Sequence, residues 1–310
     1  GRNNYFYQKM ISNQKFFYNN KKLPIDKFFE NVLFDKKVGY YSSKFPFGKK
    51  GDFLTAPCVS NLFSEMIGIW LISTWETLGK PKKFNIVELG PGDGSLTKIL
   101  VKTFHQFPEF NKVVEIFLYE KSDLLKKFQK EKIKNSKIKW IKSFENIKKG
   151  PIIFFGNEFF DAIPIKQYML KKKLLFEKYF LLTEKNKIKE IYKKVSYKDS
   201  MKVKKFKSLK KLKFVEFPKL GLDELNKITK KISKLSGGLL LIDYGYLQPS
   251  NKSTMQSVIG HKKNNLLNNL GKADITSLVN FKLLYEYFIN RKLKVKKIVT
   301  QKFFLEKMGI

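Results

Sequence analysis

The sequence predicts an α/β fold, in which helices alternate with the strands of a doubly wound, mostly parallel sheet. Two observations predict it. From residue 84 onward, short apolar runs of strand length alternate with longer segments whose apolar residues recur at helical spacing, and parallel strands need such crossover helices between them. The first apolar run also ends in a glycine-rich turn at residues 88–94, which a helical segment follows. Tight turns of this kind join a buried strand to the next helix.

The first 80 residues carry no such alternation, and they predict two helices. Pro24 suits the first turn of a helix, and residues 28–33 supply its apolar stripe. Residues 60–78 predict a second helix with large apolar side chains on one face. We therefore expect a helical cap segment at residues 1–80, packed on an α/β core at residues 81–310.

Within the core, the apolar pattern predicts each element in turn. Strands are expected at 84–87, 113–119, 138–141, 151–155, 237–242 and 295–300, and helices at 94–106, 123–132 and 275–291. Ser122 is a good N-cap for the helix that follows it. Between about residues 165 and 215, the alternation lapses into lysine-rich stretches with alternating apolar residues. This pattern predicts an inserted, β-rich segment of hairpins at one edge of the sheet.

The composition is that of a globular protein, and it excludes several classes. Of 310 residues, 43% are hydrophobic, and the longest apolar stretch, near residues 66–72, is too short to span a bilayer. Cys58 is the only cysteine, and His105 and His261 are the only histidines. We therefore expect no intrachain disulfide, no metal site and no transmembrane segment.

The formal net charge of +36 allows two interpretations. It is an electrostatic footprint for nucleic acid or anionic lipid, or it is a compositional bias towards lysine. Arg2 and Arg291 are the only arginines among 63 basic residues, whereas specific phosphate and base recognition favours the arginine fork. The bias is the favoured interpretation, and we expect no specific nucleic-acid partner.

The glycine-rich turn has a spacing that separates cofactor classes. Its glycines alternate as Gly90, Gly92 and Gly94 behind Glu88. A dinucleotide fingerprint would place its third glycine at position 95, where this chain has serine. The alternating form is typical of methyltransferases, so we assign these glycines and Pro91 to cofactor binding. A tight turn that binds no ligand is the alternative.

Two acidic residues stand at strand ends next to this turn. Glu120 ends the second predicted strand, where an acidic side chain accepts hydrogen bonds from ribose hydroxyls in doubly wound sheets. A solvated surface glutamate is the alternative. Glu88 ends the first strand, and it would meet the ammonium of the cofactor's methionine end or support the loop from behind. Both glutamates are predicted cofactor-binding residues.

The strand that ends near residue 156 is followed by a polar segment that points to an acceptor site. Glu158 and Asp161 are three residues apart, so at a turn or helix start they can project together. Two carboxylates can clamp a guanidinium, which stays protonated at ordinary pH. We predict catalytic roles for this pair, for the Asn157 amide oxygen and for His261 as a proton acceptor. An acidic N-cap and a structural histidine are the alternatives.

These motifs resemble those of the MidA-like S-adenosylmethionine-dependent methyltransferases, a family that includes a mitochondrial arginine methyltransferase of complex I assembly. The matching blocks lie at residues 33–41, 51–57, 63–68, 87–94, 157–164, 241–245, 256–261, 273–276 and 300–301. The glycine loop by itself is only a superfamily signal. Together with Asn157–Pro164 and Gly51–Pro57, it is specific.

The resemblance implies a Rossmann-like class I methyltransferase sheet that binds S-adenosylmethionine. It implies methyl transfer to an arginine of a protein substrate, a respiratory complex I subunit, and it places Thr55 and Pro57 against the cofactor pocket. It also implies the cytoplasm for a bacterial member and the mitochondrial matrix for a eukaryotic one. Two departures stand out. Cys58 stands where a glutamate is expected. Family members also continue after the Thr300-Gln301 block by a further helix and strand, whereas this sequence stops at Ile310, which suggests a fragment or an unusually short member.

Three other functions compete with this one. An assembly factor that binds the cofactor without turnover fits the Cys58 departure. An RNA methyltransferase fits the charge of +36, although the scarcity of arginine argues against it. An NAD-dependent oxidoreductase is disfavoured by the glycine spacing.

Overall fold

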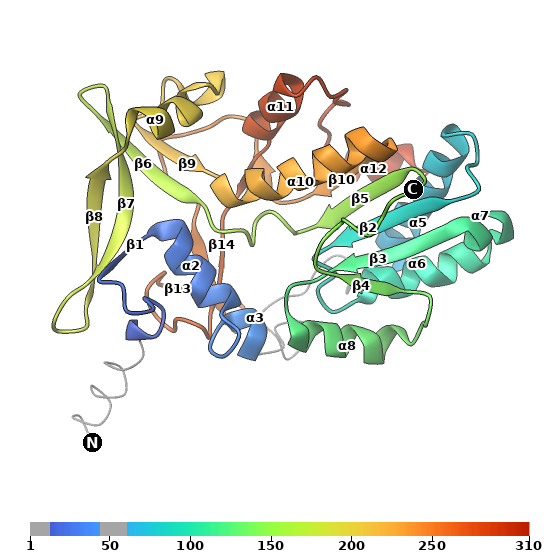
Figure 1. The fold of residues 1–310 in the computed structure, drawn as a ribbon, viewed down its shortest axis with the longest axis horizontal. Coiled ribbons are helices and arrows are strands. Elements are labelled where there is room, and N and C mark those ends of the chain that lie inside the picture. The colour runs from blue at the N-terminus through green and yellow to red at the C-terminus, as the bar shows by residue number, and fades with distance from the viewer. Residues whose placement is uncertain (1–12, 44–60, 310) are drawn as a thin grey trace. The chain divides into compact units, whose positions relative to one another are not determined.

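The computed structural model describes residues 13–43 and 61–309, and its contacts divide the chain into two compact units (Figure 1). The sheet unit takes its described residues from Tyr41–Phe159, Asp223–Asp243 and Ile298–Ile310. The hairpin unit takes its described residues from Gly1–Tyr40, Phe160–Leu222 and Tyr244–Lys297. The expected division into a cap at 1–80 and a core at 81–310 stays a prediction.

The sheet unit is built on a five-stranded sheet in the order β10-β5-β2-β3-β4, and all its pairings are parallel. Its strands are β2 (Phe84–Leu89), β3 (Val114–Tyr119), β4 (Lys139–Ile141), β5 (Ile152–Asn157) and β10 (Gly237–Ile242). These are the five strands that the apolar runs predict between residues 84 and 242. The predicted doubly wound α/β sheet is therefore confirmed.

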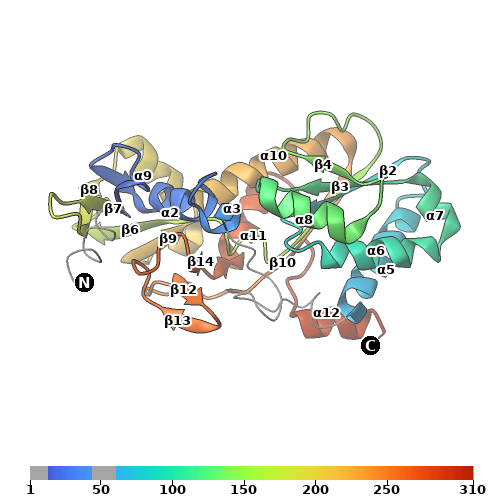
Figure 2. The same ribbon diagram turned by 90° about the horizontal axis from the view of Figure 1, so that it is seen from below.

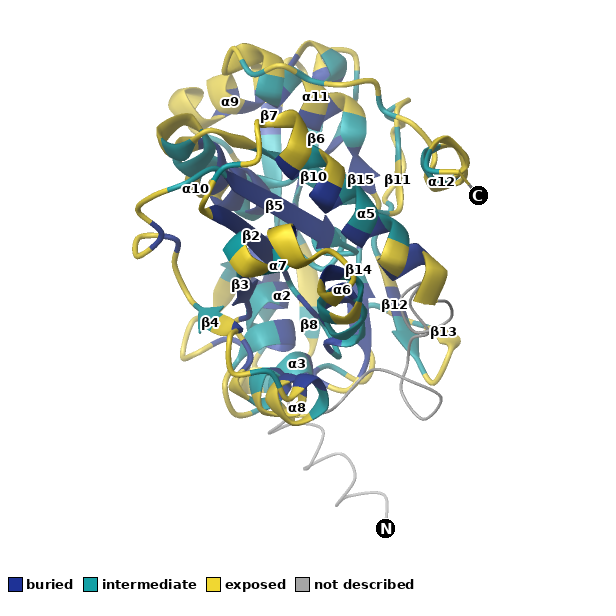
Figure 3. Cartoon of the chain, turned by 90° about the vertical axis from the view of Figure 1, so that its right-hand side faces the viewer, coloured by how far each residue is buried: buried dark blue, intermediate teal, exposed yellow. Residues whose placement is uncertain are grey.

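The central strands are buried along almost their whole length because both faces of the sheet are covered. All six residues of β2 are buried, as are the first five of β5, and both strands are dark in Figure 3. Strands that are buried on both faces read as continuous apolar runs rather than as alternating ones. This is why short uninterrupted runs were sufficient to locate them.

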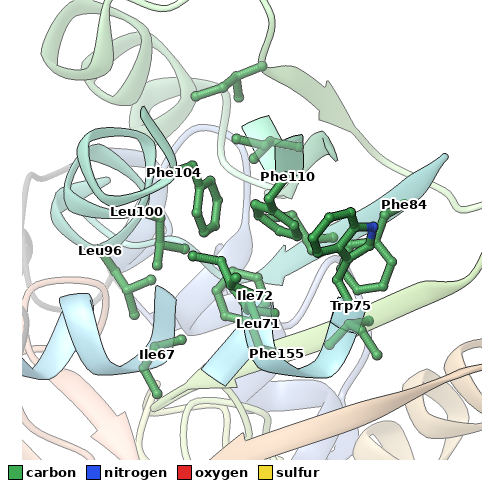
Figure 4. Packing of buried hydrophobic residues seen from close by; sticks show 14 of the residues in the cluster. Ile67, Leu71, Ile72, Trp75, Phe84, Leu96, Leu100, Phe104, Phe110 and Phe155 are labelled. Atoms are coloured by element: carbon green, nitrogen blue, oxygen red, sulfur yellow. The ribbon is translucent and has the colours of Figure 1, made fainter. Parts of the chain in front are cut away.

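Helices lie on both faces of this sheet (Figure 2). The helices of the unit are α3 (Tyr40–Ser43), α5 (Asn61–Thr77), α6 (Ser95–His105), α7 (Pro108–Val113), α8 (Asp123–Ile133), the larger part of α10 (Lys219–Leu235) and α12 (Gln301–Lys307). Apolar residues of α5 and α6 pack with β2, β3 and β5 in one core cluster (Figure 4). The hydroxyl of Tyr119 donates to Glu224 of α10 at 2.9 Å, which places α10 on the opposite face.

The strand pairings of the larger sheet in the hairpin unit are antiparallel. This sheet has the order β1-β7-β6-β9, with β8 on β7; the strands are β1 (Lys22–Pro24), β6 (Lys166–Lys171), β7 (Leu174–Leu182), β8 (Ile188–Lys194) and β9 (Phe214–Phe217). Four of them lie in the segment near 165–215 where hairpins were expected. The helices are α2 (Ile25–Phe34), α9 (Tyr197–Lys204), the short η1 (Lys207–Leu209) and α11 (Phe281–Asn290).

Short strands complete the hairpin unit, and they correct part of the sequence analysis. They are β11 (Gly245–Tyr246), β12 (Gln256–Ile259), β13 (Lys262–Asn264), β14 (Asp274–Thr276) and β15 (Val279–Asn280). The helix predicted at 275–291 was therefore wrong over its first residues. Its helical part begins at Phe281, where the side chain of Asn280 accepts from the N–H of Leu283 at 3.0 Å and caps the helix.

The strand predicted at 295–300 was also wrong, and α7 was not predicted. Residues 293–300 form no strand, because an alternating segment becomes one only when a neighbour pairs with it. The hydroxyl of Thr300 accepts from the N–H of Phe303 at 3.2 Å, and α12 starts there instead. In the described part of the chain, no helix is long and apolar enough to cross a membrane.

Candidate cofactor and acceptor site

The strand order places a topological switch point between β2 and β5. From β2 the chain continues to β3 and β4 on one side, and it then begins β5 on the other side. The two strands are in register, with Glu88 opposite Phe155. In open α/β sheets, ligands bind beyond the carboxyl ends of the strands at such a point. The glycine loop and the segment after Asn157 both begin there.

The three glycines of the loop follow a path that other residues rarely adopt. Their φ angles are +61° at Gly90, +56° at Gly92 and +77° at Gly94, and only glycine takes this left-handed region without steric cost. The N–H of Gly90 donates to the carbonyl of Tyr119 at 3.0 Å, and that of Gly94 to Pro91 at 2.8 Å. The loop is thus held by its own backbone, and its conformation requires the glycines.

Close packing adds a second reason for two of these glycines. A Cβ atom at position 90 would lie 2.8 Å from Cδ2 of Phe159, and one at position 94 would lie 3.1 Å from Cδ1 of Ile133. Phe159 follows β5, so its ring contacts the glycine loop across the switch point. The glycines therefore serve packing as well as any approach of a ligand to the backbone.

Asp93 fixes the start of α6. Its carboxylate accepts from the N–H of Ser95 at 2.9 Å and from the Ser95 hydroxyl at 2.7 Å, and it forms an ion pair with Lys132 of α8. Burial acts to raise the pKa of Asp93, but the hydrogen bonds from Lys132 and Ser95 outweigh it and hold the pKa below its ordinary value. The N-terminus of α6 is thus held in place by the charged side chain of Asp93.

Glu120 is buried at the end of β3, where it is only 7% exposed. The N–H of Ser122 donates to its Oε1 at 2.8 Å, and Nε2 of Gln129 donates to its Oε2 at 3.1 Å. Burial raises the pKa of Glu120, against the effect of these hydrogen bonds. The side chain is thus held in place rather than solvated, and its contact with ribose stays a prediction.

Glu88 is the most deeply buried acid of the site, at 3% exposure. The hydroxyl of Thr97 on α6 donates to its carboxylate. Burial raises the pKa of Glu88 to about 8, the Thr97 hydrogen bond lowers it, and the charges of Asp93 and Glu120 raise it further. The contact with α6 shows that Glu88 braces the loop and its helix; contact with a cofactor ammonium stays a prediction.

The end of β5 combines a strained backbone with unused polar capacity. Glu158 has a φ of +53°, and its N–H donates to the carbonyl of Ile242 at 2.9 Å. Burial raises the pKa of Glu158, against a hydrogen bond from Asn157. Oδ1 of Asn157 is buried and has no hydrogen-bond partner among the described residues. Strain of this kind in a non-glycine residue is typical of functional sites.

The remaining predicted residues belong to the other unit or are not described. Asp161 and His261 belong to the hairpin unit. The carbonyl of Asp161 accepts from the N–H of Ser277 at 3.0 Å, and His261, with a φ of +60°, is exposed in the turn between β12 and β13. Their catalytic roles stay predictions. Thr55, Pro57 and Cys58 lie outside the described residues.

Several residues of the site were missed by the sequence analysis. They are Asp93, Thr97, Gln129, Lys132 and Trp140. One signal could have found Gln129, because it lies on the same helical stripe as the apolar residues Leu125 and Ile133. Among the described residues, no group of three or more His, Cys, Asp or Glu side chains could hold a metal ion.

Fold and site together define a class of protein. A parallel sheet with a left-handed glycine loop at its switch point, and a buried acid at the end of the next strand, is the arrangement of doubly wound proteins that bind an adenosine-containing cofactor. The residues present fit such a group, because the carboxylate of Glu120 retains acceptor capacity beyond the donors of Ser122, Gln129 and the Lys121 backbone.

Comparison with known proteins names the family within this class. Residues 66–299 match the family model described as "Putative S-adenosyl-L-methionine-dependent methyltransferase", and the chain belongs to this family. S-adenosylmethionine is the cofactor of the family, so the predicted family and cofactor are both confirmed.

Curated relatives are named as arginine methyltransferases. The Caenorhabditis elegans protein arginine methyltransferase NDUFAF7 homolog, mitochondrial, is 30% identical over 304 residues, which cover 88% of this chain and 70% of that protein. The Homo sapiens protein is 27% identical and covers 93% of this chain and 70% of its own length. The Drosophila melanogaster homolog is 25% identical over 84% of this chain. The chain spans 65% of that fly protein's length.

A solved structure shows the same fold. It is a COG1565 superfamily member from Burkholderia thailandensis bound to S-adenosyl-homocysteine, with a TM-score of 0.80 and 18% sequence identity. The match covers 98% of this chain and 81% of that one. The predicted Rossmann-like fold of the chain is thus confirmed.

Proposed function

We propose that this protein transfers a methyl group from S-adenosylmethionine to an arginine side chain of a protein, a respiratory complex I subunit. The observation that carries the proposal is Glu158, a half-buried carboxylate on a left-handed backbone beside the glycine loop. The names of the relatives support the reaction and the acceptor type. They also support a mitochondrial location if the source is eukaryotic, and we propose the matrix; a bacterial member would be cytoplasmic.

The glycine loop, Glu120 and Glu88 would hold the cofactor. Loop glycines let a ligand approach the backbone, and Glu120 accepts hydrogen bonds from ribose hydroxyls with the lone pairs that Ser122 and Gln129 leave free. Glu88 faces the positive charge of the methionine end. When bound, the cofactor supplies a methyl group activated on a sulfonium.

The residues after β5 would prepare the acceptor. A guanidinium is a poor nucleophile because its lone pairs are delocalised and its protons are tightly held. Oδ1 of Asn157, which has no partner among the described residues, can accept a guanidinium N–H and orient the group. The carboxylate of Glu158 draws the positive charge of the guanidinium to the nitrogens that are far from the methyl group. It also accepts the proton lost on methylation, and its raised pKa suits that role.

Two measurements test the proposal. Calorimetry should detect binding of S-adenosylmethionine and none of NAD. A methyl-transfer assay on an arginine-bearing complex I subunit, with mass spectrometry to locate the methyl groups, should then find methylarginine. Methylation only of RNA or of a small amine would overturn the arginine acceptor. Cofactor binding without any turnover would favour an assembly factor.

A further inference from the structure

We propose that Gln129 is a positioning residue, which holds Glu120 and the glycine loop in the relative arrangement that sets the affinity for S-adenosylmethionine. The inference rests on the proposed cofactor roles of the loop and of Glu120. Gln129 lies on α8, and its side chain is fully buried. It connects three segments that are distant in the sequence.

The amide of Gln129 uses each of its polar groups in a different direction. Nε2 donates to the carbonyl of Gly92 at 2.8 Å and to Oε2 of Glu120 at 3.1 Å. Oε1 accepts from Nε1 of Trp140 on β4 at 2.9 Å. One side chain thus ties the loop after β2, the end of β3 and the edge strand β4.

The neighbours of Gln129 admit one orientation of its amide. With nitrogen and oxygen exchanged, the amide oxygen would face the Gly92 carbonyl and the Glu120 carboxylate, which are both acceptors. The amide nitrogen would then face the Trp140 N–H, a donor. Because burying polar groups that face others of the same kind is unfavourable, this exchange is excluded. The direction of both hydrogen-bond donors is therefore fixed.

Two consequences for the cofactor follow. The hydrogen bond from Gln129 holds the Oε2 atom of Glu120 in place, so the remaining lone pairs of this carboxylate point in fixed directions. The Gly92 carbonyl is also pinned towards α8, and because the peptide group is planar and trans, the N–H of Asp93 points the opposite way. Gln129 thus orients an acceptor and a backbone donor of the same site without touching the cofactor.

A matched substitution separates positioning from a purely structural role. Gln129→Glu keeps the size and shape of the side chain, and the introduced carboxyl can still accept from Trp140. When it is ionised, it repels Glu120 and the Gly92 carbonyl; when it is protonated, it can donate one hydrogen bond to Glu120. We therefore expect its affinity for S-adenosylmethionine to fall as pH rises, relative to wild type.

Other charges near this position are common to both proteins. The charged residues around position 129 and Glu120 come from several elements: Glu88 on β2, Asp93 in the loop, and Lys126 and Lys132 on α8. The ratio of the two dissociation constants at each pH therefore isolates the introduced carboxyl. We expect this ratio to be roughly 10–100 at pH 8 and to fall below about 5 at pH 5.5, from the cost of losing a buried hydrogen bond.

The experiment measures S-adenosylmethionine binding by calorimetry and thermal unfolding at both pH values. Gln106→Glu, which makes the same change at an exposed position in the same unit, should bind like wild type. Trp140→Phe removes the donor to Oε1 and keeps an aromatic ring, so it should weaken binding by roughly 2–5-fold and keeps the test valid if Gln129→Glu does not fold. A ratio that does not change with pH, or unaltered binding by both variants, overturns the proposal. Failure of wild type to bind would instead overturn the cofactor function itself.

Discussion

The ends of β3 and β5 differ in how far the protein satisfies its own polar groups. At the end of β3, both carboxylate oxygens of Glu120 have protein donors. At the end of β5, Glu158 has a left-handed backbone and Asn157 Oδ1 has no partner among the described residues. A buried unsatisfied group costs roughly 1–3 kcal/mol. On the proposed assignment, the protein preorganises its cofactor side and keeps the polar groups of its acceptor side available for a substrate.

The largest expected effect on activity lies on the acceptor side. Glu158→Gln keeps the shape of the side chain but removes the proton acceptor, so turnover should fall at least about 100-fold, as is typical for a positioned proton-transfer group. Calorimetry should show unchanged affinity for S-adenosylmethionine. Glu184→Gln, an exposed glutamate in the hairpin unit, serves as the control. Full turnover in Glu158→Gln would remove the distinction between the two sides.

The second prediction concerns Glu88, whose pKa is raised to about 8 by burial. A carboxyl whose pKa is raised on folding contributes stability that is present below its unfolded pKa of about 4.5 and is lost as pH rises through 8. Glu88→Gln removes this loss and keeps an acceptor for the Thr97 hydroxyl. Its stability relative to wild type should therefore rise between pH 5 and pH 9, by roughly 3–5 kcal/mol.

Denaturant unfolding of both proteins at pH 5, 7 and 9 measures this difference. Glu131→Gln, an exposed position on α8, should show a difference from wild type that stays constant with pH. A constant difference for Glu88→Gln as well would mean that Glu88 is ionised in the folded protein.

The third prediction concerns the glycine loop. Gly92→Val places a β-branched residue at a φ of +56°, a conformation that costs about 1–3 kcal/mol or displaces the loop. S-adenosylmethionine binding should weaken by up to about 100-fold. Gly79→Val is the matched control, because Gly79 has a φ of +83° and no atom lies within 4 Å of its Cβ position. An equal loss of affinity in the two variants would show that the effect comes from general backbone strain and not from the glycine loop.

The smallest expected effect concerns the ribose. Glu120→Ala should weaken S-adenosylmethionine binding by roughly 1–3 kcal/mol, because the ribose hydroxyls lose their acceptor. Thermal unfolding without cofactor measures separately any instability caused by the unpaired donors of Ser122 and Gln129. Wild-type affinity in the variant would assign the ribose contact to another residue.

The sequence predicted the central part of the fold better than its margins, for a physical reason. A parallel strand that is covered on both faces has a mostly apolar sequence, so the core strands can be located from the sequence alone. Residues 275–280 and 293–300 depend instead on which neighbour pairs with them, and a single sequence does not contain that information. The same holds in the site. The spacing of the glycines and the position of Glu120 are local signals, whereas the bonds of Gln129 to Gly92 and Trp140 join distant segments.

The contact between Phe159 and Gly90 joins the glycine loop to the segment that follows β5. The aromatic ring next to Glu158 lies where any side chain at position 90 would be. A cofactor that shifts or stiffens the loop must therefore change the environment of the acceptor residues, and because linkage is reciprocal, the acceptor must change cofactor affinity by the same factor. We therefore expect, on the proposed assignment, that a saturating concentration of either substrate changes the dissociation constant of the other by the same factor.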